Sequence, residues 1–290
     1  MLGIFSALGA ACSWTYACSL WRQQTKYFSS IEINSIKNII AFCIFSPVIL
    51  TLDFNSNFKE IYLLLVSGFI GIAVGDSFYI ASLKKLGTRR TLTFEAISPL
   101  LATILGSFLL NEKPQFKVWI GTLIVTFSLI GVASQRAKGE EFEDSIPSQN
   151  NGIFFALISV LCAVIAAILS RNVLINSNLN PFQTTEIRLL GSLIALLPFV
   201  RIDVYEKIKR LSFENKFRLF FATLLGTNLG ILLQQNVFKI LPIGLGWTLL
   251  STSPAFSLLF AKSEGEKLNW KNLALTATTI SGVAIAFISL

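Results

Sequence analysis

Long apolar runs and short polar corners alternate along almost the whole chain. Each run is about 20 residues long, the length that an α-helix needs to cross the hydrocarbon core of a membrane. A transmembrane β-barrel would instead show shorter segments in which apolar and polar residues alternate. The pattern therefore predicts an all-α integral membrane protein with ten transmembrane helices, at Leu2–Trp21, Ile33–Leu52, Ile61–Leu83, Thr91–Leu110, Val118–Ala133, Gly152–Ser170, Phe182–Val200, Leu219–Phe238, Gly244–Ala261 and Leu273–Leu290.

The second half of the chain repeats the first. EAISPLLATILGSFLLNEKP (Glu95–Pro114) has a counterpart in STSPAFSLLFAKSEGEKL (Ser251–Leu268), where a Ser-Pro pair again opens an apolar run and a Glu-Lys corner ends it. Matching residues recur at an offset of 149 in the first helix of each half, 151 in the second, and 155 in the third and fourth. The pattern predicts two five-helix repeats, 1–134 and 152–290, joined by a polar linker, 135–151. Because five is an odd number, the second repeat would enter the membrane from the opposite side, which gives an inverted repeat.

The composition agrees with a membrane protein and argues against several other classes. Hydrophobic residues make up 53% of the 290 residues, and the mean hydropathy is +0.66, too apolar for a soluble fold of this size. The net charge of +8 does not indicate nucleic-acid binding, because Lys and Arg lie mainly in the corners where topology rules place them. The chain has no histidine, and its four cysteines lie without ligand spacing inside apolar runs, so we expect no metal and no cofactor.

Several short motifs recur in the order typical of one family. They are Ser13-Trp14 in the first helix, Lys37 early in the second, the Ser-Pro pairs at Ser98-Pro99 and Ser253-Pro254, the corners at Glu112 and Glu266, and Gly131-Val132-Ala133 with Gly282-Val283-Ala284 closing each half. In this set the chain resembles the drug/metabolite transporter (DMT) superfamily and, within it, the EamA-like permeases of ten helices. Thr15 departs from the glycine that usually follows the tryptophan. The resemblance implies export or exchange of small metabolites, such as amino acids, without ATP.

Ionisable residues inside the apolar runs are the first candidates for substrate binding, because a charge inside a membrane is costly and usually functional. They are Lys37, Asp76, Glu95, Glu186 and Arg188. Lys37 and Arg188 are equivalent in the two repeats and would attract a carboxylate or phosphate, unless they extend to the lipid headgroups. Asp76 would bind an amine or a coupling proton, unless it serves as a hydrogen-bonding link between helices.

Neutral polar and aromatic residues complete the candidate site. Tyr79 shares a helix face with Asp76. Asn228, Gln234 and Gln235 are amides of the eighth run, and they should point into the bundle because amides that face lipid are costly. Trp14 could stack on a ligand, although an aromatic near a helix middle more often serves packing. The predicted substrate-binding residues are thus Trp14, Lys37, Asp76, Tyr79, Arg188, Asn228, Gln234 and Gln235.

The sequence predicts a secondary transporter, not an enzyme, that exports or exchanges a small metabolite by alternating access around a central cavity. We expect it in the bacterial inner membrane, with the lipid bilayer and a small-molecule substrate as partners and a proton as a candidate coupling ion. Two alternatives remain open. One is a membrane-embedded enzyme acting on a lipid-linked group, for which the sequence offers no convergent acid, base or metal set. The other is a transporter of a phosphorylated or nucleotide-linked sugar.

Two arguments disagree about orientation. The resemblance implies that both termini lie in the cytoplasm. The corners after the first, third, fifth, seventh and ninth helices carry most of the loop Lys and Arg, however, and these corners would then face outward. Because basic loops normally stay in the cytoplasm, the charge distribution favours the opposite orientation.

Overall fold

The computed structural model describes residues 2–53, 57–133, 146–200, 202–253, 256 and 270–288. The regular elements in these residues are all helical. In chain order they are α1 (Leu2–Gln24), α2 (Ser30–Phe45), η1 (Ser46–Thr51), α3 (Phe58–Gly68), η2 (Phe69–Gly75), α4 (Asp76–Phe94), η3 (Glu95–Ile97), α5 (Ser98–Leu109), α6 (Phe116–Ala133), α7 (Ile146–Asn176), α8 (Pro181–Leu196), η4 (Leu197–Phe199), α9 (Ile202–Arg210), α10 (Phe213–Ala222), η5 (Thr223–Leu229), α11 (Gly230–Ile240), α12 (Ile243–Leu250) and α14 (Trp270–Phe287).

Within the described residues, helical elements lie over the predicted runs, but several boundaries differ. The basic corner expected between the third and fourth runs is helical except at Gly87, where a φ of 80° turns the chain. Glycine adopts this backbone conformation without the steric cost that a Cβ would add. The predicted linker is helical from Ile146 onward, because α7 begins there, and its earlier residues lie outside the described ranges. Most of the ninth predicted run beyond Ser253 also lies outside the described residues.

The same capping device starts the second helix of each half. In α2 the backbone N–H of Glu32 donates to Ser29 Oγ at 3.3 Å, and the N–H of Ser29 donates back to the Glu32 carboxylate at 2.7 Å. In α8, Asn180 and Gln183 make the reciprocal pair, with both distances 3.0 Å. These positions are related by the repeat offset of 151. Each pair satisfies backbone donors that the start of a helix leaves free, so the two helices share a local cause of helix formation as well as their apolar character.

The third helix of each half contains a π-helical segment in its middle. η2 joins α3 to α4 in the first half, and η5 joins α10 to α11 in the second. Such wide turns interrupt the regular i to i−4 hydrogen bonds and are frequent at functional sites. The two segments lie at corresponding positions in the sequence. η2 contains Gly71, and η5 contains its counterpart Gly226 at the offset of 155.

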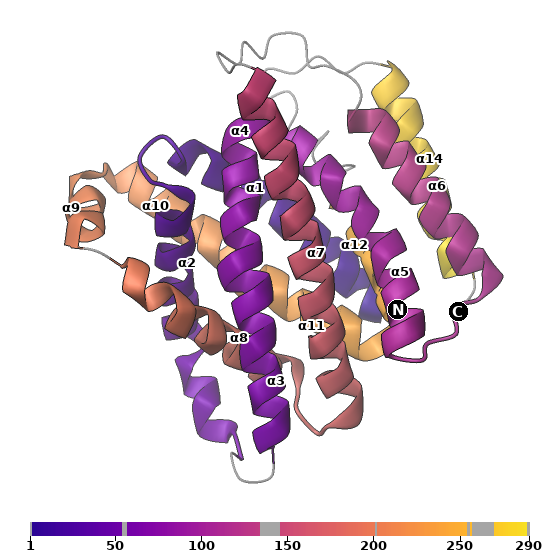
Figure 1. Cartoon of the computed structure of the whole chain (residues 1–290), viewed down its shortest axis with the longest axis horizontal. Coiled ribbons are helices and arrows are strands. Elements are labelled where there is room, and N and C mark those ends of the chain that lie inside the picture. Colours follow the sequence, from indigo (N-terminus) through magenta and orange to yellow (C-terminus); the bar gives the residue numbers. More distant parts are fainter. Residues whose placement is uncertain are drawn as a thin grey trace.

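Packing between the halves is reciprocal. α1 of the first half packs on η5 and α11 of the second, and α7 of the second half packs on η2 and α4 of the first. Figure 1 shows α4 and α7 side by side in the centre, with α6 and α14 paired at one end of the molecule. The α6–α14 contact is close, since a Cβ added to Gly121 would lie 2.5 Å from the backbone oxygen of Gly282. The two halves therefore form one interdigitated bundle.

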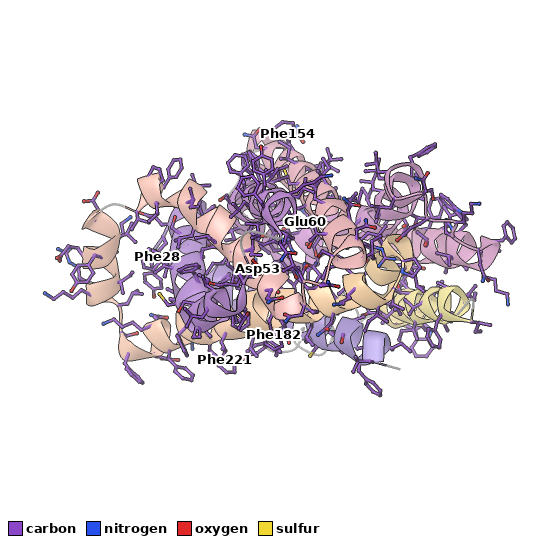
Figure 2. The ribbon with its side chains drawn as sticks, turned by 90° about the horizontal axis from the view of Figure 1, so that it is seen from below. Phe28, Asp53, Glu60, Phe154, Phe182 and Phe221 are labelled. Carbon is purple, nitrogen blue, oxygen red and sulfur yellow. The ribbon has the colours of Figure 1, made fainter. Side chains whose placement is uncertain are left out.

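The outer surface of the bundle is rich in large apolar side chains. Phe5, Phe127 and Phe154 are all more than half exposed, and Figure 2 shows Phe154 at the outer margin of the helices. Within the described residues, five helical stretches are long and apolar enough to cross a membrane, at Ser30–Thr51, Phe58–Thr88, Arg90–Leu109, Asn150–Asn176 and Phe213–Ile240. An apolar exterior of this kind suits contact with lipid, because water would penalise the exposed area.

Candidate functional site

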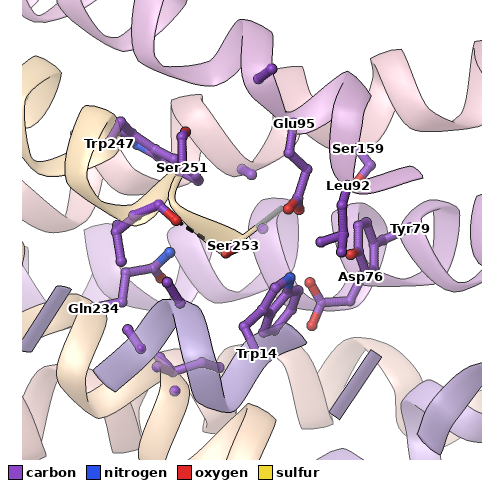
Figure 3. Close-up of a pocket in the computed structure, with 18 of the residues that line it drawn as sticks. Trp14, Asp76, Tyr79, Leu92, Glu95, Ser159, Gln234, Trp247, Ser251 and Ser253 are labelled. Carbon is purple, nitrogen blue, oxygen red and sulfur yellow. Dashed lines mark hydrogen bonds between the residues drawn. The ribbon is translucent and has the colours of Figure 1, made fainter. Parts of the chain in front are cut away.

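A central cavity of about 90 Å³ lies where elements of both halves meet. One water requires roughly 10–15 Å³, so the space exceeds a single hydration site. Figure 3 shows Trp14, Asp76, Tyr79 and Glu95 on one side, with Gln234, Trp247 and Ser251 on the other. Arg188 from α8 also contributes to the wall.

Equivalent positions of the two repeats line this cavity in pairs. Trp14 corresponds to Ala163 at the first-helix offset, and at the offset of 155 the other pairs are Asp76 with Ile231, Tyr79 with Gln234, Leu92 with Trp247, and Glu95 with Leu250. The first half thus supplies two carboxylates where the second supplies aliphatic side chains. Positions related by the repeat offsets therefore lie on the same cavity wall but differ in chemical character.

Asp76 forms an ion pair with Lys37. Asp76 stands at the start of α4 and lines the cavity, whereas Lys37 on α2 is fully buried and is not part of the wall. Its Nζ also lies 5.1 Å from the centre of the Trp21 ring, a favourable position for a cation. The positive charge of Lys37 is therefore already neutralised within the protein, and this side chain supports the wall from behind.

Among the described residues that line the cavity, Arg188 is the basic one. It is 4% exposed, and its Nε and Nη1 atoms have no hydrogen-bond partner among the described residues. Its backbone position is fixed by close packing of α8 on α3, since a Cβ added to Gly68 of α3 would lie 1.9 Å from the Arg188 carbonyl oxygen. A guanidinium with unused donors next to a cavity is suited to a carboxylate or phosphate, which can accept two of its hydrogen bonds.

Glu95 is an acidic wall residue that is not among the predicted binding residues. It belongs to η3, the short 3₁₀ segment directly before the Ser98-Pro99 pair that opens α5. Its carboxylate points toward the indole ring of Trp14 and lies on the same side of the cavity as Asp76 (Figure 3). The sequence marks Glu95 as ionisable within an apolar run, and its place before a repeated Ser-Pro pair is the signal that could have selected it.

Aromatic rings form one wall beside these carboxylates. The centroids of Trp14 and Tyr79 are 5.4 Å apart, as are those of Trp14 and Trp21. The Tyr79 hydroxyl lies 3.1 Å from Cys18 Sγ. Since each ring is held by another ring or by a hydrogen bond, the wall is preorganised and could contact a bound ligand without first becoming ordered.

The predicted amide cluster divides into two kinds of residue. Gln234 reaches the cavity. Asn228 instead donates to the Ala41 carbonyl at 3.0 Å, and Gln235 accepts a hydrogen bond from Ser170, so these two buried amides join helices. Such links are the usual structural use of amides in a membrane bundle.

Several wall residues near the end of α12 were not predicted either. They are Trp247, Ser251 and Ser253, and Ser253 Oγ donates to the Leu250 carbonyl at 3.0 Å (Figure 3). The Thr15 hydroxyl lies 2.7 Å from the Ala11 carbonyl oxygen in its own helix and 3.0 Å from the Ser253 carbonyl oxygen, so its single proton is shared between the two acceptors. The side chain thus places α1 in contact with the segment after α12, a contact that a glycine could not make. Among the described residues, no group of three or more His, Cys, Asp or Glu side chains could hold a metal ion.

Known proteins match this chain over nearly its whole length. The model of the EamA-like transporter family matches residues 1–134 and 150–288. A protein of Archaeoglobus fulgidus, named as an uncharacterized transporter, is 26% identical over 268 residues, which cover 90% of this chain and 88% of the relative. A solved crystal structure shares the fold with a TM-score of 0.73 at 15% identity, over 99% of this chain and 96% of that one. The chain therefore belongs to the EamA-like transporter family of the DMT superfamily and is an integral membrane transporter.

Proposed function

We propose that the protein is a secondary transporter that exports or exchanges a small zwitterionic metabolite, such as an amino acid, by alternating access around the central cavity. In this proposal the halves are inverted five-helix repeats, and the substrate binds between them. The reciprocal packing of α1 on α11 and of α7 on α4 supports such a pair, because each half supplies the equivalent surface to the other.

The observation that carries the proposal is the charge arrangement in the cavity wall. Arg188 offers unused guanidinium donors, while Asp76 and Glu95 offer carboxylates from the other half. A zwitterion matches both signs at once: its carboxylate would bind Arg188, and its ammonium group would bind the acidic side. The aliphatic residues Ile231 and Leu250 would face the remaining, less polar part of the substrate.

The same charges disfavour the alternative of a phosphorylated or nucleotide-linked sugar. Lys37 is already paired with Asp76, so a phosphate would meet Arg188 together with two acidic side chains. Like charges at short range in a poorly solvated cavity cost free energy. A zwitterion avoids this repulsion because it carries its own positive group.

Flux into liposomes tests the proposal. Purified full-length protein is reconstituted, and uptake is compared for a panel of radiolabelled amino acids, amines without a carboxylate, and sugar phosphates. We expect amino acid flux that needs no ATP, with the substrate recovered chemically unchanged. A membrane-embedded enzyme would return a modified product, and preference for sugar phosphates would contradict the proposal.

A matched pair of arginine variants tests the role of Arg188. A hydrogen bond to a charged group contributes about 1.5–3 kcal/mol, so Arg188→Gln should raise the KM for carboxylate substrates by about 10- to 150-fold. Arg218→Gln, on the exposed surface of α10, is the control and should leave the KM unchanged. An unchanged KM in Arg188→Gln would remove the residue from the proposed site.

A further inference from the structure

The two carboxylates of the cavity wall differ in how their charge is balanced. Asp76 is paired with Lys37. Glu95 has no Lys or Arg within 4 Å among the described residues, and its polar neighbour on α1 is the uncharged indole of Trp14. An ionised carboxylate without a cation inside a membrane protein is costly, and such residues commonly carry protons in transporters.

From this difference we propose that Glu95 binds a proton and the ammonium group of the substrate in alternation, and thereby couples transport to proton movement. The inference rests on the function proposed above. When the substrate arrives, the Glu95 O–H bond breaks, the proton leaves to the solution on that side, and the carboxylate pairs with the ammonium group. When the substrate leaves, a proton from the solution restores the neutral acid. Because one carboxylate cannot hold both ligands, substrate and proton must exchange.

The groups around Glu95 are compatible with this alternation. Asp76 and Tyr79 face it from α4, Cys18 stands behind Tyr79 on α1, and Arg188 approaches the cavity from α8. Three other helices, α5, α6 and α7, pack on η3. α5 contains no titratable residue, and α6 contains Lys117 in its first turn. α7 contains Cys162 and Arg171. Of the two wall carboxylates that the structure describes, Asp76 has a cationic partner in Lys37, whereas Glu95 has no Lys or Arg within 4 Å, so a proton or an ammonium group can balance the charge of Glu95.

The repeat supplies an independent reason to single out Glu95. Its equivalent in the second half is Leu250, which also lines the cavity. An aliphatic residue satisfies the packing of this wall position in one half. The carboxylate in the other half is therefore not required by the architecture, which favours a chemical role.

Proton release on substrate binding tests the inference. The probe is a mixture of the proteinogenic amino acids, added to the purified full-length protein in weakly buffered detergent solution with a pH indicator dye. The wild type should release a proton on binding, and its apparent Kd should rise by up to about tenfold for each unit that the pH falls. Glu95→Gln should release none and lose this pH dependence, and Glu95→Asp should restore both.

The control and the liposome assay keep the outcome interpretable. Glu214→Gln removes an exposed carboxylate of α10 and should behave like the wild type. In liposomes, an imposed pH gradient should drive accumulation by the wild type and by Glu95→Asp but not by Glu95→Gln. Gradient-driven accumulation or proton release that persists in Glu95→Gln would overturn the inference. A wild type that neither binds nor moves any amino acid would instead refute the proposed function.

Discussion

The Lys37 ammonium group donates a hydrogen bond to the Asp76 carboxylate, and this ion pair joins α2 to α4 directly behind the cavity wall. Lys37 is fully buried, while Asp76 retains access to the cavity. The pair therefore has two functions that mutations can separate: it compensates a buried charge, and it presents a carboxylate to the cavity.

A double mutant should separate these functions. Asp76→Asn leaves the Lys37 charge buried without a partner, which should lower the unfolding free energy by about 3 kcal/mol. The same variant should also lose transport activity, because the cavity loses a carboxylate. Adding Lys37→Met removes the orphaned charge and should recover most of the stability, while flux stays low because the cavity still lacks the carboxylate. Thermal unfolding in detergent and liposome flux measure the two effects. Normal flux in the stable double mutant would show that Asp76 has a structural role alone.

A second ion pair joins the two halves at the end of α5. Arg171 on α7 donates to Glu112 and to the Phe238 carbonyl, and the other carboxylate oxygen of Glu112 accepts from the Ile243 backbone N–H at 2.8 Å. Glu112→Gln should therefore lower the unfolding free energy by about 3 kcal/mol. Glu214→Gln, which breaks the exposed pair with Arg218, should cost less than about 1 kcal/mol. Equal melting temperatures for the two variants would argue against a structural role for the Glu112 network.

The close approach of α3 to α8 makes Gly68 sensitive to substitution. In Gly68→Ala the new Cβ would lie 1.9 Å from the Arg188 carbonyl oxygen, so the helices must separate. We expect the unfolding free energy to fall by about 2 kcal/mol. Substrate binding should also weaken, because the same backbone positions Arg188. In Gly9→Ala the Cβ would meet the flexible end of Leu233 at 3.1 Å, and this control should be nearly neutral. Thermal melts of both variants provide the comparison, and equal losses would contradict the packing argument.

Orientation can be decided at Asn150, an exposed residue near the start of α7. The distribution of Lys and Arg predicts that this end of α7 lies in the cytoplasm. In a background with the native cysteines replaced, Asn150→Cys should resist an impermeant maleimide in intact cells and react after permeabilisation. Reaction in intact cells would instead support cytoplasmic termini.

The sequence determined the class of protein because the relevant signals are local or periodic. Apolar runs of membrane-spanning length, a Ser-Pro pair that recurs before equivalent helices, and the match of Lys37 with Arg188 are all readable along the chain. The caps at Ser29 and Asn180 are local in the same sense, because a capping side chain bonds to the first turn of its own helix.

The tertiary structure decided which of these residues meet. Hydropathy reveals that Lys37 and Asp76 lie within apolar runs, but the pairing of α2 with α4 joins their charges and leaves Arg188 and Glu95 at the cavity. The rotation of α11 likewise turns Gln234 toward the cavity and Gln235 toward Ser170, although the two are adjacent in the chain. Successive residues on a helix point about 100° apart, so the packing of the whole bundle, and not the composition of one run, selects the side chains that reach the cavity.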